Sequence, residues 1–333
     1  MTSFRRDLNR CMPAEIAACA LFAAAIATVA QQPATQTSAP AASSGQGAPS
    51  PALHGKPFDT PQQAANALIE AASTFDETAL VEIFGPGGED VVFTGELPQD
   101  RQRAADFAAE AREKTSVSID PKNGSRSFVL VGNEEWPFPV PLVKIGAKWD
   151  FDANAGRQEM LYRRIGANEL SAIDLCEGYV EAQYDFAFRK RSEYDVSQYA
   201  QNIIAPSGTQ DGLAWQDADG SWEGPIGEKI ARAIQRGYDK QGEPYRGYYY
   251  KVLKGQGQAA PLGAMNYLVG GIMIGGFALV AAPAEYRVTG VKTFIVSNDG
   301  VVYERDFGPE TLDEFKKMEV FNPDKSWAPA QGQ

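Results

Sequence analysis

The sequence predicts an α+β protein in which two α+β domains follow one another, residues 58–155 and 156–327. Two observations predict this fold class. In each segment, apolar residues with helical spacing come first and β-prone runs come after them. Near the end of the chain, Asn298-Asp299-Gly300 separates two such runs, and this turn sequence is a strong signal for an antiparallel hairpin. With 333 residues and 44% hydrophobic content, the chain can build two cores of modest size.

Helices are expected at the start of the first domain. Thr60-Pro61 supplies an N-cap and a proline for the first helical position, and apolar residues then recur at helical spacing through Ala72. A short helix is expected after Asp76, and the glycines and proline of residues 85–88 end it. Residues 101–114 indicate a third helix with one charged face.

The strands of the first domain are expected at residues 117–119, 127–131, 137–145 and 148–151, with Gly146-Ala147 as the turn of the last hairpin. Paired helices followed by a curved antiparallel sheet are similar to the order of elements in cone-shaped NTF2-like domains. This similarity concerns the fold alone.

The second domain is expected to begin with a long helix over residues 157–189, in which Gly166 is a candidate position for a break or kink. Residues 202–222 are rich in turn-forming side chains and predict an irregular segment. A short amphipathic helix is expected over residues 226–238.

An antiparallel meander is expected to follow this helical part. Its strands are predicted at residues 245–253, 277–281, 291–296 and 301–304. A closing helix is expected over residues 311–318, and residues 328–333 are expected to form a disordered tail.

The first thirty residues have the three parts of a secretory signal peptide. Arg5, Arg6 and Arg10 form a basic beginning, residues 14–30 are mostly apolar, and Thr28-Val29-Ala30 offers the small side chains that a signal peptidase recognises. We therefore expect cleavage near Ala30 and a periplasmic or secreted protein. An uncleaved membrane anchor is the alternative.

Residues 31–57 are rich in Pro, Ala, Ser, Gln and Gly and are expected to form a disordered linker. Cys11 and Cys19 precede the expected cleavage position, so Cys176 is the remaining cysteine of the mature chain. It lies in the long helical pattern, where a cysteine is more often a small buried apolar residue than a nucleophile.

Charge and motif content exclude several classes of function. The formal net charge of −12 argues against binding to nucleic acid, which requires a basic surface. His54 is the only histidine, so a histidine-based catalytic triad and a site of several histidines on a metal are excluded. The sequence contains no cofactor-binding motif, and we expect no cofactor and no metal.

The stretch Leu268–Ala282 is apolar, but it is about fifteen residues long where a membrane span needs roughly twenty. Two glycine pairs interrupt it. We expect no transmembrane span in the mature chain, and Ile272-Met273-Ile274 suits a short strand or turn beside a buried strand.

Two groups of residues are candidates for function. Carboxylates near tryptophans can perform acid–base chemistry on a sugar, although carboxylates also occur on solvated sheet edges. The acid–base candidates are Glu134, Glu135, Asp150 and Asp152, and the tryptophans beside them, Trp136 and Trp149, are candidates for a binding surface.

The second group consists of Tyr248, Tyr249 and Tyr250 on one predicted strand. Strand alternation places Tyr248 and Tyr250 on one face and Tyr249 on the other. An exposed aromatic face would be a platform for a partner, whereas a face turned inward would belong to the core.

Several segments resemble an uncharacterised bacterial family that is catalogued as domain of unknown function 2950. They are residues 164–170, 179–183, 247–253 and, most specifically, the glycine-rich strand that begins at Ile274 and continues to Tyr286. The resemblance covers the chain from about Phe58 to its end. It implies an exported envelope protein of Gram-negative bacteria, and it supplies no catalytic residues.

The C-terminal half is also weakly similar to the soluble part of pseudopilin-like proteins. The similarity rests on a helix that ends at Ala182-Gln183, the tyrosine-rich strand, the turn at Thr289-Gly290 and the hairpin at Asp299-Gly300. The hydrophobic N-terminal helix that defines pilins has no counterpart in this sequence.

These observations favour a non-catalytic periplasmic protein that binds an envelope protein or a cell-wall component. The alternative is a carboxylate-dependent hydrolase that acts on a glycan or peptide of the envelope. A deep pocket where the candidate carboxylates converge would favour the hydrolase, and a flat aromatic or apolar patch would favour the binding protein.

Overall fold

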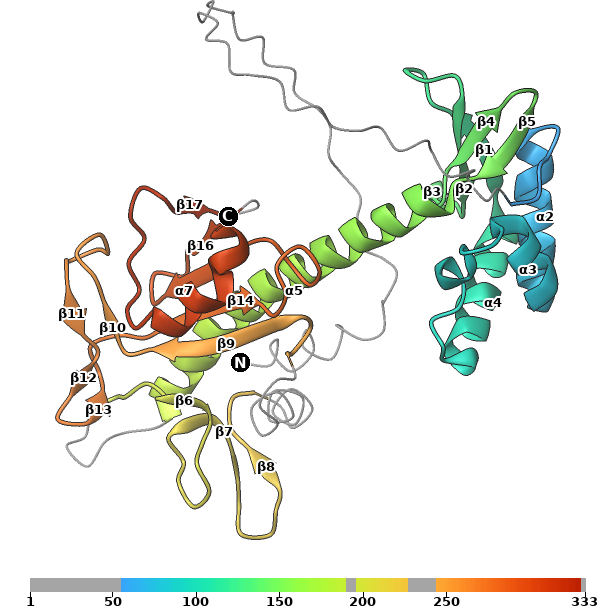
Figure 1. Cartoon of the computed structure of the whole chain (residues 1–333). Coiled ribbons are helices and arrows are strands. Elements are labelled where there is room, and N and C mark those ends of the chain that lie inside the picture. Colours follow the sequence, from blue (N-terminus) through green and yellow to red (C-terminus); the bar gives the residue numbers. More distant parts are fainter. Residues whose placement is uncertain (1–54, 190–195, 227–243, 331–333) are drawn as a thin grey trace, which may run out of the picture. The chain divides into compact units, whose positions relative to one another are not determined.

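The computed structural model describes residues 55–189, 196–226 and 244–330, and the chain divides into two compact units (Figure 1). The division falls between Tyr162 and Arg163, inside the long helix α5 (Ala153–Arg189). Each unit has helices and a mainly antiparallel sheet, which confirms the predicted α+β class. The signal peptide, the linker up to residue 54 and the helix predicted over 226–238 (from residue 227 on) lie outside the described residues.

The predicted caps form the helix starts of unit 1. The helix α2 (Pro61–Thr74) begins after Thr60, whose side chain accepts a hydrogen bond from the Gln63 N–H. The helix α3 (Glu77–Phe84) begins after Asp76, whose carboxylate accepts from the Ala79 N–H, and it ends at Gly85. The predictions for both helices are confirmed.

The third helix starts earlier than the sequence predicts. The helix α4 (Leu97–Glu113) follows a 3-10 turn, η1 (Glu89–Val91), and has a proline in its first turn. The carboxylate of Asp100 is buried. Its burial is tolerated because it accepts hydrogen bonds from both the N–H and the hydroxyl of Thr94. In its first turns α4 buries Asp100 and no apolar side chain, and its first buried apolar residue is Ala104. The apolar periodicity therefore gave no signal for the start of this helix.

Helices cover one face of the unit 1 sheet. Its strands are β1 (Thr115–Ile119), β2 (Arg126–Val131), β3 (Trp136–Pro137), β4 (Leu142–Ile145) and β5 (Lys148–Phe151). The order is β1-β2-β4-β5, all pairs are antiparallel, and β3 pairs with β2. The helices α2 and α4 contact β2, and α2 and α3 contact β5, so Val129, Leu142 and Phe151 join the helices in one core.

The strand predicted over residues 137–145 is only partly formed. Residues 142–145 form β4, and the turn Gly146-Ala147 leads into β5 as predicted. The residues between β3 and β4 include Pro139 and Pro141, which have no N–H to donate to a neighbouring strand.

Unit 2 is layered, with α5 on one face of its main sheet and the helix α7 (Thr311–Lys317) on the other (Figure 1). The strands run in the order β17-β16-β15-β14-β9 with antiparallel pairing. Their bounds are β9 (Tyr248–Leu253), β14 (Ala278–Pro283), β15 (Thr293–Ser297), β16 (Val302–Arg305) and β17 (Ala328–Pro329), and a 3-10 turn, η2 (Gly308–Glu310), precedes α7. The predicted hairpin at residues 298–300 joins β15 to β16 and is confirmed.

Gly166 does not break α5, which is continuous through this position. No atom of another described element lies within 4 Å of the place where a Cβ at Gly166 would stand. This glycine therefore does not serve a close contact with another part of the described structure. Farther along α5, Cys176 is fully buried against the sheet, as predicted, and burial raises the pKa of its thiol far above the usual range.

The segment 202–222 was predicted to be irregular, and this prediction is wrong. It contains a small sheet of β6 (Asn202–Ile204), β7 (Gly212–Gln216) and β8 (Trp222–Glu223), with β6 parallel and β8 antiparallel to β7. A Cβ at Gly212 would lie 2.3 Å from the Ala205 nitrogen, so glycine permits the close approach of two strands. Short strands between turns leave too little alternation to detect in the sequence.

Residues 164–170 of α5 hold the loop before β15. The Asn168 amide donates a hydrogen bond to the Thr289 carbonyl at 2.9 Å. The carboxylate of Glu169 accepts from the backbone N–H groups of Val291 and Lys292 at 2.8 and 3.0 Å. A carboxylate that accepts two backbone hydrogen bonds fixes the path of a loop strongly, because charge-assisted hydrogen bonds exceed neutral ones in strength.

We expect Glu169→Ala to lower the free energy of unfolding by about 2 kcal/mol, because two backbone donors lose a charged acceptor. Chemical denaturation followed by circular dichroism would measure this loss. Glu181→Ala is the matched control, since Glu181 is an exposed glutamate of the same helix. Equal effects of the two substitutions would contradict the role given to Glu169.

Candidate functional site

The candidate carboxylates of unit 1 have separate structural roles. Glu134 accepts a hydrogen bond from the indole N–H of Trp136 at 3.0 Å. Glu135 pairs with Lys114, with 2.7 Å between carboxylate oxygen and ammonium nitrogen. Both glutamates are exposed.

Asp152 and Asp150 lie at the end of β5. The carboxylate of Asp152 accepts from the Ala155 N–H at 3.0 Å in the first turn of α5 and so caps this helix. Asp150 is buried and alternates along β5 with Trp149 and Phe151, which face the core. Glu135 and Asp152 are therefore already engaged within unit 1, in an ion pair and in a helix cap.

The two candidate tryptophans differ in their surroundings. Trp149 belongs to the core of unit 1, and its backbone pairs in both directions with Phe58 at 2.8 Å. Trp136 is half-buried at the edge of the same core. Neither ring forms the exposed platform that a binding surface requires.

The three tyrosines alternate as predicted, but they lie in the core of unit 2. Tyr248 and Tyr250 are buried beneath α5, and the Tyr248 hydroxyl donates to the Lys292 carbonyl at 2.9 Å. Tyr249 faces the other way and packs on Phe315 of α7, with 6.5 Å between ring centroids. Their rings therefore stabilise the layers of unit 2 and are not presented to a partner.

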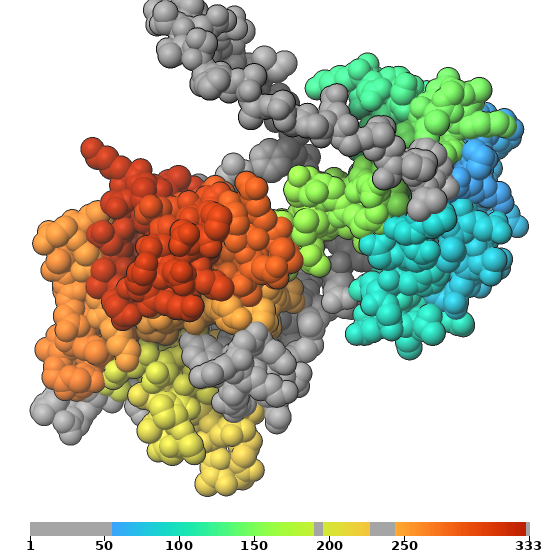
Figure 2. Space-filling model, in the orientation of Figure 1, coloured from blue at the N-terminus to red at the C-terminus, as the bar shows by residue number. Residues whose placement is uncertain are grey.

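A different surface of unit 2 carries exposed apolar side chains. Residues 254–276, which we call the ribbon, contain two small hairpins and no charged residue after Lys254. The hairpin strands are β10 (Gly255–Gln256) with β11 (Met265–Asn266), and β12 (Leu268–Val269) with β13 (Ile272–Met273). In the space-filling view, the orange atoms of this part of the chain lie at the outer edge of unit 2 (Figure 2).

Five aliphatic side chains are exposed on or beside the ribbon. The exposed fraction is highest for Leu262, at 96%. The others are Val269 at 54%, Val320 at 41%, and Met265 and Ile274 at 37% each. Scattered apolar residues are normal on a protein surface, whereas a group on one short segment marks a place of contact.

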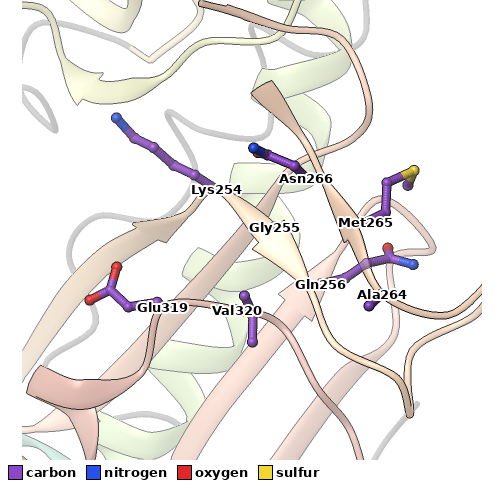
Figure 3. A pocket seen from close by; sticks show the side chains of 8 residues that line it. All are labelled: Lys254, Gly255, Gln256, Ala264, Met265, Asn266, Glu319 and Val320. Atoms are coloured by element: carbon purple, nitrogen blue, oxygen red, sulfur yellow. The ribbon is translucent and has the colours of Figure 1, made fainter. Parts of the chain in front are cut away.

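An open groove of about 450 Å³ lies on the ribbon. Gly255 forms its floor, with Lys254, Glu319 and Val320 on one side and Met265 and Asn266 on the other (Figure 3). A Cβ at Gly255 would stand 3.0 Å from the Met265 carbonyl oxygen and 3.5 Å from a Val320 methyl carbon. The groove is open because this position has no side chain.

The exposed leucine occupies a strained turn. The Gly263 N–H donates to the Ala260 carbonyl at 3.0 Å, which closes a turn with Pro261 and Leu262 at its corner. Leu262 has a φ of 69°, a left-handed conformation that a type II turn normally assigns to glycine. A strained residue persists only where the structure around it holds it in place, and such residues often serve function.

Hydrogen bonds from side chains hold this turn. The side-chain amide of Gln256 donates to the Pro261 carbonyl and, at 2.7 Å, to the Gly263 carbonyl, and these two carbonyls flank Leu262. The Gln256 carbonyl accepts from the Tyr267 hydroxyl at 2.9 Å, and burial raises the pKa of Tyr267 to about 12. The Ala259 N–H donates to the Asn322 side chain at 2.9 Å. The turn that presents Leu262 is therefore rigid.

Sequence reasoning missed the ribbon as a site. It recognised that residues 268–282 do not span a membrane and that Ile272-Met273 forms a short strand, and the latter is confirmed. The available signal was the absence of charge in residues 255–276, which precede the buried strand β14. No motif marks Gln256, because its partners are backbone carbonyls.

In the described ranges, no three or more His, Cys, Asp or Glu side chains lie together as metal ligands would. Across the same ranges, the structure contains no helix that is both long and apolar enough to span a bilayer.

The fold thus consists of two α+β units that share helix α5, and the second unit carries the apolar ribbon. The profile of the family described as "Protein of unknown function (DUF2950)" matches residues 55–330, and the chain belongs to this family. No curated protein and no solved structure matches the chain significantly. The comparisons therefore add no support for a pseudopilin-like or an NTF2-like relationship.

We expect Gln256→Ala to speed amide hydrogen exchange in residues 257–264 by roughly tenfold or more, because two carbonyls and the Tyr267 hydroxyl lose their partner. Exchange measured by mass spectrometry would show this local effect. Gln258→Ala is the control, since Gln258 is exposed in the same loop. If both variants exchange like the parent chain, Gln256 does not hold the turn.

Proposed function

We propose that this protein is an exported, non-catalytic binding module of the bacterial cell envelope, with the ribbon as its contact surface. The observation that carries the proposal is the almost fully exposed Leu262, which hydrogen bonds from the Gln256 side chain hold in a strained turn. An enzyme can tolerate such a loop, but a binding module has a direct use for it, because a rigid apolar group loses little conformational entropy on binding.

The chemistry of the ribbon supports contact with an apolar surface. Residues 255–284 carry no charge, so their burial against a partner removes no ion from water. The rest of the chain is strongly acidic, with a net charge of −12, which keeps it soluble and limits association elsewhere. The ribbon thus has fewer charged residues than the rest of the chain, and the cores of protein interfaces are depleted of charge in the same way.

The hydrolase alternative has less support. It requires two carboxylates that converge on a substrate in a cleft. Glu135 pairs with Lys114 and Asp152 caps α5, while Glu134 is exposed and bonded to Trp136. No observation in unit 1 favours catalysis over these structural roles.

Export makes a prediction about thiols. If cleavage occurs near Ala30, the mature protein has lost Cys11 and Cys19, and the buried Cys176 is its only thiol. We expect the periplasmic fraction to contain a chain that begins near Gln31 and that reacts with a thiol reagent only after unfolding. Intact mass and thiol titration would measure both properties. A full-length chain with fast-reacting thiols would contradict export by cleavage.

We expect a photoreactive amino acid at position 262 to crosslink the protein, in intact cells, to one envelope component. The same amino acid at position 97 of unit 1 is the control, because Leu97 is also exposed, at 50%. Crosslinking from position 262 but not from position 97, and its loss in a Gln256→Ala background, would support the proposed surface. Equal labelling from both positions would contradict it.

A further inference from the structure

The ribbon contains both halves of a self-complementary contact. The apolar tip at Leu262 projects from the loop between β10 and β11, and the groove lies on the same two strands. Four of the eight residues that line the groove are small or aliphatic, namely Gly255, Ala264, Met265 and Val320 (Figure 3). The other four are Lys254, Gln256, Asn266 and Glu319. An aliphatic side chain can therefore pack on the apolar part of the groove while the charged groups stand beside it.

The charges at the groove are also self-complementary. Lys254 is exposed and has no ion-pair partner among the residues that the structure describes. Glu319 forms an ion pair with Lys251 of its own chain at 3.5 Å, and its side chain is 80% exposed, so its carboxylate can also accept from a second cation. A twofold axis can therefore create two ion pairs. In each pair, the lysine of one copy meets the glutamate of the other.

From this arrangement we propose that the ribbon binds a second copy of this chain. Leu262 of each copy enters the groove of the other, and Lys254 of each copy faces Glu319 of the other across a twofold axis. This inference rests on the proposed function, because it names what the contact surface binds. Each contact then occurs twice, once in each direction, as in every isologous dimer.

The same features argue against a lipid surface as the occupant. The ribbon after Lys254 has no lysine or arginine, and the net charge of −12 opposes docking on anionic lipid. One inserted leucine per chain is also a weak membrane anchor. The contact between two copies is small, so the dimer is expected to be weak and to depend on concentration.

Sedimentation velocity over a wide range of concentrations, on protein purified from cells that express the complete 333-residue sequence, tests the proposal. We expect the parent chain to dimerise as concentration rises. Leu262→Gly should weaken dimerisation roughly 100-fold or more, since two leucines leave the interface. Glycine adopts the left-handed turn without strain, so this variant keeps its fold. Leu97→Ala, in unit 1, is the control and should dimerise like the parent.

Charge exchange tests the paired contacts. Lys254→Glu and Glu319→Lys should each weaken dimerisation, because each places like charges opposite one another. The double variant should bind more tightly than either single variant, since the pairs across the axis are restored with reversed sign, although Lys251 repels the new lysine at position 319. Additive losses in the double variant would overturn the twofold pairing.

Other outcomes separate this inference from the proposed function. A parent chain that stays monomeric at every concentration overturns the second copy as occupant, even if position 262 crosslinks to another envelope component in cells. Dimerisation that is unchanged in Leu262→Gly overturns it as well. Dimerisation that is lost in Leu262→Gly supports the inference, and it does so even if fractionation finds the protein outside the envelope.

Discussion

The buried amide of Gln183 connects the parts of unit 2 on which the ribbon depends. It donates to the Ala200 carbonyl at 2.9 Å and accepts from the Ala200 N–H at 2.8 Å, so the side chain pairs with the backbone as a neighbouring strand would. The adjacent residue, Tyr199, donates its N–H to the Met273 carbonyl of β13 at 2.8 Å. The helix α5 thus positions the second hairpin of the ribbon through two successive residues. A buried amide without these partners would cost more than the bonds contribute, which makes the arrangement specific.

Aromatic packing extends this arrangement toward the sheet. Tyr199 packs edge-on against Phe277, with 4.8 Å between ring centroids, and Phe277 also contacts Tyr179 and Tyr184 of α5. Phe277 directly follows the ribbon and precedes β14. A Cβ at Gly276 would lie 2.8 Å from the ring of Tyr267, so glycine is required where the ribbon passes this cluster. Gly276 therefore allows the close packing of the chain against Tyr267, and Ile274, just before the glycine pair, remains exposed.

The sequence predicts elements that carry a cap, turn or periodicity signal, and it fails where strands are very short or where a side chain bonds to backbone carbonyls. Thr60 and Asp76 act as caps within their own turns, so the starts of α2 and α3 could be located. The sheet of residues 202–223 was missed because its strands are only two to five residues long, which leaves too little alternation to detect. The tyrosines of β9 alternate as predicted, yet their pattern does not reveal that helices cover both faces. Leu262 was not singled out, because its exposure follows from hydrogen bonds that Gln256 makes with backbone atoms.

The lack of charge in the ribbon has a consequence for proteolysis. Exposed turns are the usual places where a folded protein is cut. Trypsin requires a lysine or arginine, and between Lys254 and Arg287 the chain has neither. The exposed turns around Leu262 and Val269 are therefore resistant to trypsin-like proteases without being covered. Complete digestion with trypsin releases the ribbon from Gly255 onward as one peptide, residues 255–287. Recovery of this peptide reports whether a labelling reagent has modified the surface.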